Sequence, residues 1–268
     1  AIDRDYMIEL LSSAQEFIGE NGFKGIRVST RPDAVDGEIC DILEKYHVTA
    51  VELGAQSTND KVLAMNRRGH TREDIFRSAR LLKERGFELG LQMMTGLYGS
   101  NDEDSIGTAR DIISLSPDTA RIYPTVVIEN TELAELYRNG EYRPQTPEEA
   151  AVLCAKILPM FERAGIKVIR LGLHSGGDVE GSFVAGAYHP ALREMCEGHI
   201  YFDIINRALS GKEKGKYIIY VAPREISKAS GQRRCNIEKL RELGYECRIK
   251  ENAALSARDI TLEKVNLL

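Results

Sequence analysis

Residues 48–74, VTAVELGAQSTNDKVLAMNRRGHTRED, contain the features that decide the predicted fold. The run 48–53 is rich in β-branched residues and has the length of a strand, and residues 54–59 interrupt it with small and polar side chains before a helical pattern begins. After a second polar break, Thr71 opens another helix with Asp74 as its third residue, the spacing of a capping box. The stretch therefore predicts a strand, a polar loop and helix.

Three polar side chains fall in the two breaks of this stretch. Gln56 stands where the predicted strand ends, and Arg68 and His70 stand in the second break. If the strand and helices form as predicted, these side chains cluster on one side of the strand. The spacing alone leaves two interpretations open: a ligand-binding cluster, or helix caps at Gln56 and Arg68 with a solvated His70.

The same unit recurs through the first two thirds of the chain. Strand patterns alternate with helical patterns that end at glycine or a polar residue, with strands at 25–30, 48–53, 87–94, 119–123 and 166–173 and helices at 3–20, 36–46, 71–85, 100–114 and 146–164. Such alternation implies parallel βαβ units with right-handed crossovers. We therefore expect an α/β fold with a barrel-like parallel sheet.

Residues just past the strand ends should line one site, because all the connecting loops open on the same face of such a fold. They are Ser29, Thr30, Arg31, Gln56, Ser57, Gln92, Met94, Tyr123 and His174. No nucleophile–base triad, HExxH or GxxxxGK motif is among them, whereas Gln, Ser and Arg suit a polar ligand. A glycine-rich stretch at 172–186 indicates a flexible lid or linker, or simply a loop.

The pattern changes near residue 189. A helix is predicted at 192–209, followed by a strand, a helix and two further strands. We therefore predict two domains, at 1–188 and 189–268, of which the second is a small β-α-β-β appendage. The loop at 224–234 mixes Ser and Gly with four cations, among them Arg233 and Arg234. It is either a solvated loop or a phosphate-contacting loop for RNA or another anion.

Composition excludes several classes of protein. The chain has 268 residues, 29% charged residues and a net charge of −5, which is typical of an ordinary cytoplasmic protein. These values argue against a strongly basic surface that would bind nucleic acid over its whole extent. No apolar run approaches the roughly 18 residues of a membrane span. The cysteines are odd in number and scattered, so we predict neither disulfides nor a metal site from them: Cys40, Cys154, Cys196, Cys235 and Cys247.

Six segments together resemble one known family. They are RVSTRPD (27–33), VELGAQS (51–57), NRRGHT (66–71), QMMTGL (92–97), RIYP (121–124) and RLGLH (170–174). In this order they are similar to the radical S-adenosylmethionine domain of the Elongator catalytic-subunit family and, more distantly, to oxygen-independent coproporphyrinogen oxidase. The resemblance covers residues 1–175.

This resemblance implies a partial (β/α)6 barrel that binds S-adenosylmethionine and a [4Fe–4S] cluster. Gln56, Arg68 and Gln92 match positions that contact S-adenosylmethionine, and Ser29 stands where relatives often carry Glu. We assign cofactor binding to Gln56, Arg68, Gln92, Ser29 and Met94. We assign substrate binding to Arg31, His70, Tyr123, His174, Arg233 and Arg234.

The family's CxxxCxxC cluster loop has no counterpart in this sequence and would precede Ala1. We therefore expect a radical S-adenosylmethionine barrel that lacks its first βα unit, holds no cluster by itself and is inactive alone. The appendage stands where the Elongator subunit has an acetyltransferase domain. An open sheet edge would also make the chain prone to self-association.

The sequence leaves several functions open. The leading hypothesis is a radical S-adenosylmethionine enzyme that abstracts hydrogen from an RNA or small-molecule substrate, with transfer RNA as the expected partner. The alternatives are a non-catalytic RNA- or protein-binding module on a barrel scaffold and an enzyme similar to porphyrinogen oxidase.

Overall fold

The computed structural model describes residues 2–173 and 181–265. Its packing divides the chain into two compact units. The first consists of Ala1–Thr146 and Ile157–Tyr188, and the second of Pro147–Lys156 and His189–Leu268. Helix α7 (Pro147–Arg163) thus contributes residues to both units. Among the described helices, none combines the length and the apolar character that a membrane crossing requires.

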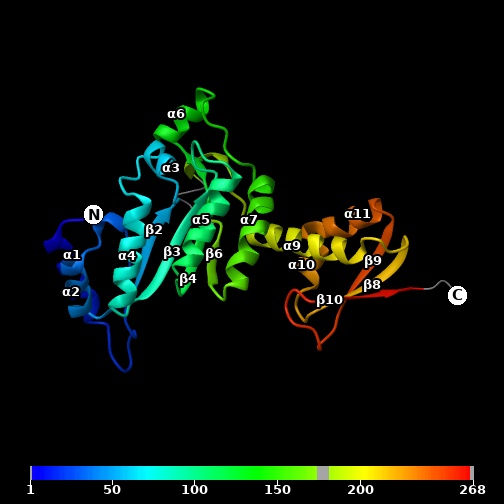
Figure 1. Cartoon of the computed structure of the whole chain (residues 1–268), viewed down its shortest axis with the longest axis horizontal. Helices are drawn as coiled ribbons and strands as arrows, with labels where there is room; N and C mark the ends of the chain where they lie inside the picture. Colours follow the sequence, from blue (N-terminus) through cyan, green and yellow to red (C-terminus); the bar gives the residue numbers. More distant parts are fainter. Residues whose placement is uncertain (1, 174–180, 266–268) are drawn as a thin grey trace. The chain divides into compact units, whose positions relative to one another are not determined.

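A five-stranded parallel sheet forms the centre of the first unit (Figure 1). Its strands lie in the order β1 (Ile26–Thr30), β2 (Val48–Gln56), β3 (Glu88–Thr95), β4 (Thr119–Pro124) and β6 (Lys167–Leu171). Every neighbouring pair is parallel, and each strand lies beside the next one in this order. This arrangement confirms the predicted α/β fold with a barrel-like parallel sheet.

Three helices of this unit begin where the sequence placed their caps. Asp3 caps α1 (Arg4–Gln15), Asp36 caps α2 (Gly37–Lys45), and Thr71 forms the predicted capping box with Asp74 at the start of α4 (Arg72–Glu84). The remaining helices are η1 (Pro32–Ala34), α3 (Asp60–Met65), α5 (Asp102–Ser114) and α6 (Glu132–Arg138). Helices α4 and α5 pack on the sheet, where Ile75, Leu82 and Ile112 are fully buried.

Several boundaries differ from the prediction. Strand β2 continues through Gln56, so residues 54–56 belong to the strand and not to a loop. The cap of α5 is Asn101 with Asp104, one residue later than expected. A two-stranded antiparallel sheet of β5 (Val126–Ile128) and β7 (Phe183–Gly186) was not predicted, and β7 occupies part of the expected lid. Residues 174–180 of that stretch lie outside the described residues.

The second unit packs helices on one face of a three-stranded sheet. Strands β10 (Ile260–Lys264), β8 (Gly215–Val221) and β9 (Tyr245–Glu251) lie in that order, with β8 and β9 parallel and β10 antiparallel to β8. The predicted loop at 224–234 contains α10 (Ile226–Ser230) and η2 (Gln232–Arg234), so that prediction of an irregular loop was wrong.

Long apolar side chains join the helices of the second unit to its sheet. Helices α9 (Leu192–Leu209) and α11 (Cys235–Glu242) contribute to a core with Tyr201, Ile205, Ile219, Leu240 and Tyr245. The core residues of the strands alternate, Tyr217, Ile219 and Val221 on β8 and Tyr245 and Cys247 on β9, so the other face of the sheet remains without helices from this core.

Candidate functional site

A cavity of about 940 Å³ lies in the first unit beside strands β1, β2 and β3. Its polar lining residues are Arg4, Ser29, Thr30, Arg31, Glu52, Gln56, Arg68 and Gln92. Its apolar lining comes mainly from α1, β1 and α2, with Met7, Leu10, Leu11, Val28, Ile39 and Leu43. The structure therefore brings four of the predicted cofactor-binding residues to one cavity: Ser29, Gln56, Arg68 and Gln92.

The backbone around Gln56 directs its side chain in this cavity. The pairing of β2 with β3 shifts register between Gly54 and Gln56, and Gln56 has a φ of +63°. The Ser57 N–H donates to the Ala55 carbonyl at 2.7 Å, closing a tight three-residue turn. Bulges of this kind re-aim a side chain next to many active sites, and the positive φ of a residue other than glycine stores strain of roughly 1–3 kcal/mol.

Two glutamine amides form a pair on the cavity wall. Gln92 Nε2 donates to Gln56 Oε1 at 3.1 Å, and Gln56 is buried. A side chain at position 54 would collide with this pair, because its Cβ would lie 2.6 Å from Gln56 Nε2. Gly54 therefore leaves the space that the Gln56 amide occupies.

Arg68 brings a partly buried positive charge to the cavity. Its Nε is buried without a hydrogen-bond partner among the described residues. Burial lowers the pKa of the Arg68 guanidinium, and the nearby charge of Arg31 lowers it further. Arg31 itself pairs with Asp33, at 2.6 Å between NH2 and Oδ2. Arg68 thus offers a cation and a buried donor to an anionic group in the cavity.

A buried acid, Glu52, was missed by the sequence analysis. It is 3% exposed, and its Oε2 lies 2.8 Å from Arg121 Nε and 4.0 Å from Arg27 NH1. The N–H of Arg121 does not point at this oxygen, so the contact is an ion pair without a well-aligned hydrogen bond. Hydrogen bonding to Tyr123, followed by the charge of Glu52, raises the pKa of Arg121.

A glycine on the intervening strand makes room for this network. Glu52 on β2 and Arg121 on β4 lie on either side of β3, where Gly90 stands opposite Glu52. A Cβ on Gly90 would lie 3.2 Å from the Glu52 side chain. The sequence does contain a signal for Glu52, an acid inside an otherwise apolar strand. Its partners could not be predicted, because they come from strands far apart in the chain.

Other predicted site residues lie elsewhere. His70 is 5% exposed, and its Nε2 lies 3.1 Å from the Ala55 carbonyl, so the ring supports the end of β2 and does not line the cavity. Met94 and Tyr123 pair in register on β3 and β4 outside the lining, and Tyr123 accepts a hydrogen bond from Arg121. Arg233 and Arg234 belong to the second unit. His174 lies outside the described residues.

The residues that line this cavity offer no thiol for chemistry. All five cysteines are free, and none lines the cavity. Burial raises the pKa of Cys154 to about 12 and that of Cys247 to about 11, which keeps both thiols protonated. Among residues 2–173 and 181–265, no group of three His, Cys, Asp or Glu side chains is placed to hold a metal ion.

Comparison with family models identifies two adjacent matches. Residues 2–112 match the model described as the radical SAM superfamily, and residues 117–201 match the radical SAM C-terminal domain. The polar cavity lies within the first of these matches, and the barrel strands β1 to β3 supply its polar wall.

Curated relatives give the same result. A tRNA uridine(34) acetyltransferase of Methanocaldococcus jannaschii is 35% identical over 142 residues, which are 51% of this chain and 26% of the relative. Elongator complex protein 3 of Homo sapiens is 34% identical over 146 residues, 51% of this chain and 25% of the relative. The alignments thus span about a quarter of the length of these relatives.

A solved structure shares the fold. The Elp3 protein of the archaeon Methanocaldococcus infernus, with an N-terminal deletion, superposes with a TM-score of 0.62 at 24% identity. The match covers 75% of this chain and 55% of that chain.

Proposed function

We propose that the chain binds S-adenosylmethionine in the cavity of its first unit and forms part of an RNA-modifying enzyme. The basis is that the chain belongs to the radical SAM superfamily and is homologous to Elongator complex protein 3. In such an enzyme a radical derived from the cofactor abstracts hydrogen from the substrate, and the protein supplies binding and orientation. The relative from Methanocaldococcus jannaschii is a tRNA uridine(34) acetyltransferase, which supports RNA as the substrate class.

The buried, unpartnered Nε of Arg68 is the observation that carries this proposal. An uncompensated buried donor on a cation costs free energy unless a ligand satisfies it. S-adenosylmethionine carries a carboxylate, which a guanidinium binds well. A cavity of about 940 Å³ is also within the range of typical small-molecule sites.

The remaining lining supplies complementary groups. The paired amides of Gln56 and Gln92 offer donors and acceptors to the polar parts of the cofactor. The apolar wall with Val28 and Ile39 can cover its less polar parts and exclude water. An iron–sulfur cluster requires thiolates, which this cavity lacks, so the role assigned to these side chains is to hold and orient S-adenosylmethionine.

Calorimetric titration of the full chain with S-adenosylmethionine tests the proposal without requiring enzyme activity. Substituting Arg68→Ala should weaken binding roughly 10- to 100-fold, because a charge-assisted hydrogen bond contributes about 1.5–3 kcal/mol. Gln56→Ala should weaken it about fivefold, the loss of a neutral hydrogen bond of about 1 kcal/mol. Gln232→Ala, an exposed amide in the second unit, is the control and should leave affinity unchanged.

A second variant separates side-chain from backbone effects at position 56. Gln56→Gly removes the same amide and also relieves the positive φ, whereas Gln56→Ala keeps the strain. Equal losses of affinity would show that the amide binds the cofactor. If the parent chain does not bind S-adenosylmethionine, a non-catalytic binding module becomes the better description. If Arg68→Ala binds it as tightly as the parent, the proposed role of Arg68 is wrong.

A further inference from the structure

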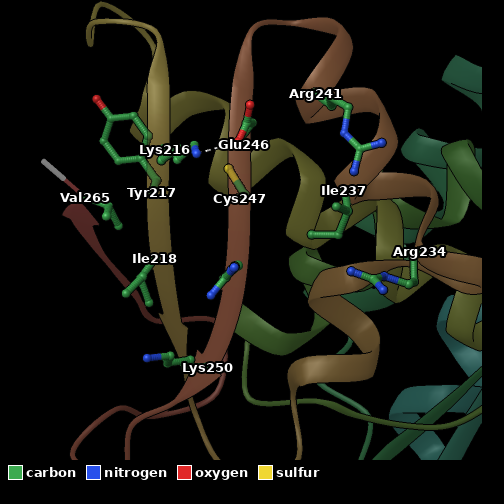
Figure 2. A pocket seen from close by; sticks show the side chains of 11 residues that line it. Lys216, Tyr217, Ile218, Arg234, Ile237, Arg241, Glu246, Cys247, Lys250 and Val265 are labelled. Atoms are coloured by element: carbon green, nitrogen blue, oxygen red, sulfur yellow. Dashed lines mark ion pairs between the residues drawn. The ribbon is translucent and has the colours of Figure 1, made fainter. Parts of the chain in front are cut away.

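A second hollow, of about 680 Å³, lies in the second unit along strand β9 (Figure 2). Figure 2 shows Arg234 and Ile237 on its helical side and Glu246, Cys247 and Lys250 along β9. We call it the basic cleft, because its lining contains five cations and one acid: Lys216, Arg234, Arg241, Arg248 and Lys250, with Glu246. The whole chain, in contrast, has 36 Lys and Arg against 41 Asp and Glu.

Regular secondary structure places these cations in two rows. Arg248 and Lys250 are two residues apart on β9, so their side chains project from the same face of the strand. Arg234 and Arg241 stand seven residues apart, at the N-cap and in the last turn of α11. Two helical turns separate them by about 10 Å along one side of the helix. Arg248 and Lys250 project from the face of β9 opposite its core residues Tyr245 and Cys247, whereas α11 packs on the core side, so the two rows flank the edge strand β9. The basic cleft thus presents charge around this edge and not at a single point.

Most of this charge has no counter-ion in the protein. Lys216 pairs with Glu246 at 3.6 Å, and both side chains are about half exposed. Within the part of the chain that the structure describes, Arg234, Arg241, Arg248 and Lys250 make no ion pair with a carboxylate. Exposed arginines elsewhere do find acids: Arg4, for example, pairs with Glu38 at 2.8 Å. Unpaired cations in close proximity repel one another and favour an external anion.

We infer that the basic cleft is a docking surface for the phosphate backbone of RNA. The choice of RNA over an acidic protein rests on the proposed function, since relatives of this chain are transfer-RNA-modifying enzymes. The cations are exposed and spread over two strands and one helix, which suits an extended polyanion better than a small phosphate ester.

The lining also predicts the mode of RNA binding. Its only aromatic residue, Tyr217, is 4% exposed, and its hydroxyl donates to the Glu213 carbonyl. No ring is therefore presented for base stacking by the described lining residues. We expect contacts with phosphates alone, which position an RNA without reading its sequence.

Fluorescence anisotropy with a labelled transfer RNA transcript and the full 268-residue chain tests this inference. Each phosphate contact contributes a slope of about −0.7 to −0.9 in a log–log plot of affinity against salt. The variant Arg241→Glu with Arg248→Glu should therefore bind at least about tenfold more weakly at low salt and have a slope shallower by about 1.5. The neutral pair Arg241→Gln with Arg248→Gln should give a smaller loss in the same direction.

A matched control has the same net charge as the charge-reversed cleft variant. Arg110→Glu with Lys212→Glu changes the charge equally at exposed positions outside the basic cleft. Equal losses of affinity for transfer RNA in the two charge-reversed double variants would show a general charge effect and overturn the inference. Unchanged affinity in the cleft variant would also overturn it. Binding of labelled poly-glutamate by the parent chain, without binding of transfer RNA, would overturn it in favour of an acidic protein partner.

The result is separable from the test of the cofactor cavity. If the cleft variants lose RNA while the parent fails to bind S-adenosylmethionine, the inference stands and the proposed function fails. If S-adenosylmethionine binds but the cleft variants bind RNA like the parent, the proposed function stands and the inference fails.

Discussion

The two units place their polar residues in opposite ways. In the first unit, Glu52 and Gln56 are at most 4% exposed and contact partners on other strands of the same sheet. In the second, the cations of the basic cleft are exposed, and four of them lack a carboxylate partner among the described residues. In the first unit, polar groups are buried in fixed positions at a cost in free energy, whereas in the second unit the cations remain in solvent.

This difference has consequences for recognition. Buried hydrogen-bonding groups with fixed orientation discriminate a small molecule by shape, and salt screens them little. Exposed cations attract any polyanion, and salt weakens the attraction strongly. Affinity for S-adenosylmethionine should therefore change little between low and moderate salt, whereas affinity for RNA should fall steeply.

The largest expected effect on stability comes from the buried ion pair of the first unit. Arg121→Leu leaves Glu52 with only Arg27, whose NH1 is 4.0 Å away, and should destabilise the fold by about 3 kcal/mol. Denaturant unfolding measures this loss. Glu246→Gln in the basic cleft breaks an exposed pair and should cost less than about 1 kcal/mol.

A double variant tests the cause. Replacing Glu52 as well as Arg121 by Leu removes the buried acid, so at least about 1 kcal/mol should be regained relative to Arg121→Leu. Arg27 keeps its ion pair with Glu88 in that variant. A double variant as unstable as the sum of the two single variants would mean that packing, and not the buried charge, explains the loss.

A moderate effect is expected at His70, which supports the cavity without lining it. His70→Phe keeps an aromatic ring at this position but removes the hydrogen bond to the Ala55 carbonyl, at a cost of about 1 kcal/mol. Because Ala55 precedes Gln56, the turn should loosen and affinity for S-adenosylmethionine should fall about threefold in calorimetry. Affinity for RNA at the basic cleft is the internal control and should not change.

His70 is thus a positioning residue, and a merely structural role would give a different result. Loss of stability without loss of cofactor affinity would show that the turn at Gln56 does not depend on this ring. Rescue of affinity by His70→Gln, which retains a donor amide, would support the positioning role.

Local patterns predicted most of the first unit because caps and apolar runs act within a few residues. Thr71 with Asp74 and the apolar run from Val48 required no knowledge of distant residues. The pair β5 and β7 escaped prediction because each strand has only three or four residues and its partner lies more than 50 residues away. Helix α10 has five residues, too few for a periodic pattern.

The sites were predicted less completely than the fold. Gln56 and Gln92 could be named because they were predicted near strand ends, and Arg68 because it stands in a polar break between helices; the resemblance assigned all three the same role. Glu52 could not, since its ion pairs depend on the register of three strands. In the basic cleft the sequence indicated Arg234 but missed Arg241 and Arg248, which come from a helix face and a strand face that only the fold brings together.

The smallest expected effect concerns Arg234, which follows Arg233 in a turn where both have positive φ, +65° and +51°. A left-handed conformation costs a residue with a Cβ about 1 kcal/mol, and glycine avoids this cost but loses more entropy on folding. Arg234→Gly should therefore stabilise the second unit by about 0.5 kcal/mol relative to Arg234→Ala, in which the strain remains. Both variants remove the same cation, so both should bind transfer RNA about threefold more weakly than the parent, with equal salt slopes. Thermal unfolding and anisotropy measure the two quantities independently. If Arg234→Gly bound RNA more weakly than Arg234→Ala, the strained turn would contribute to RNA binding by holding the cleft in shape, and the charge of Arg234 would not be its whole role.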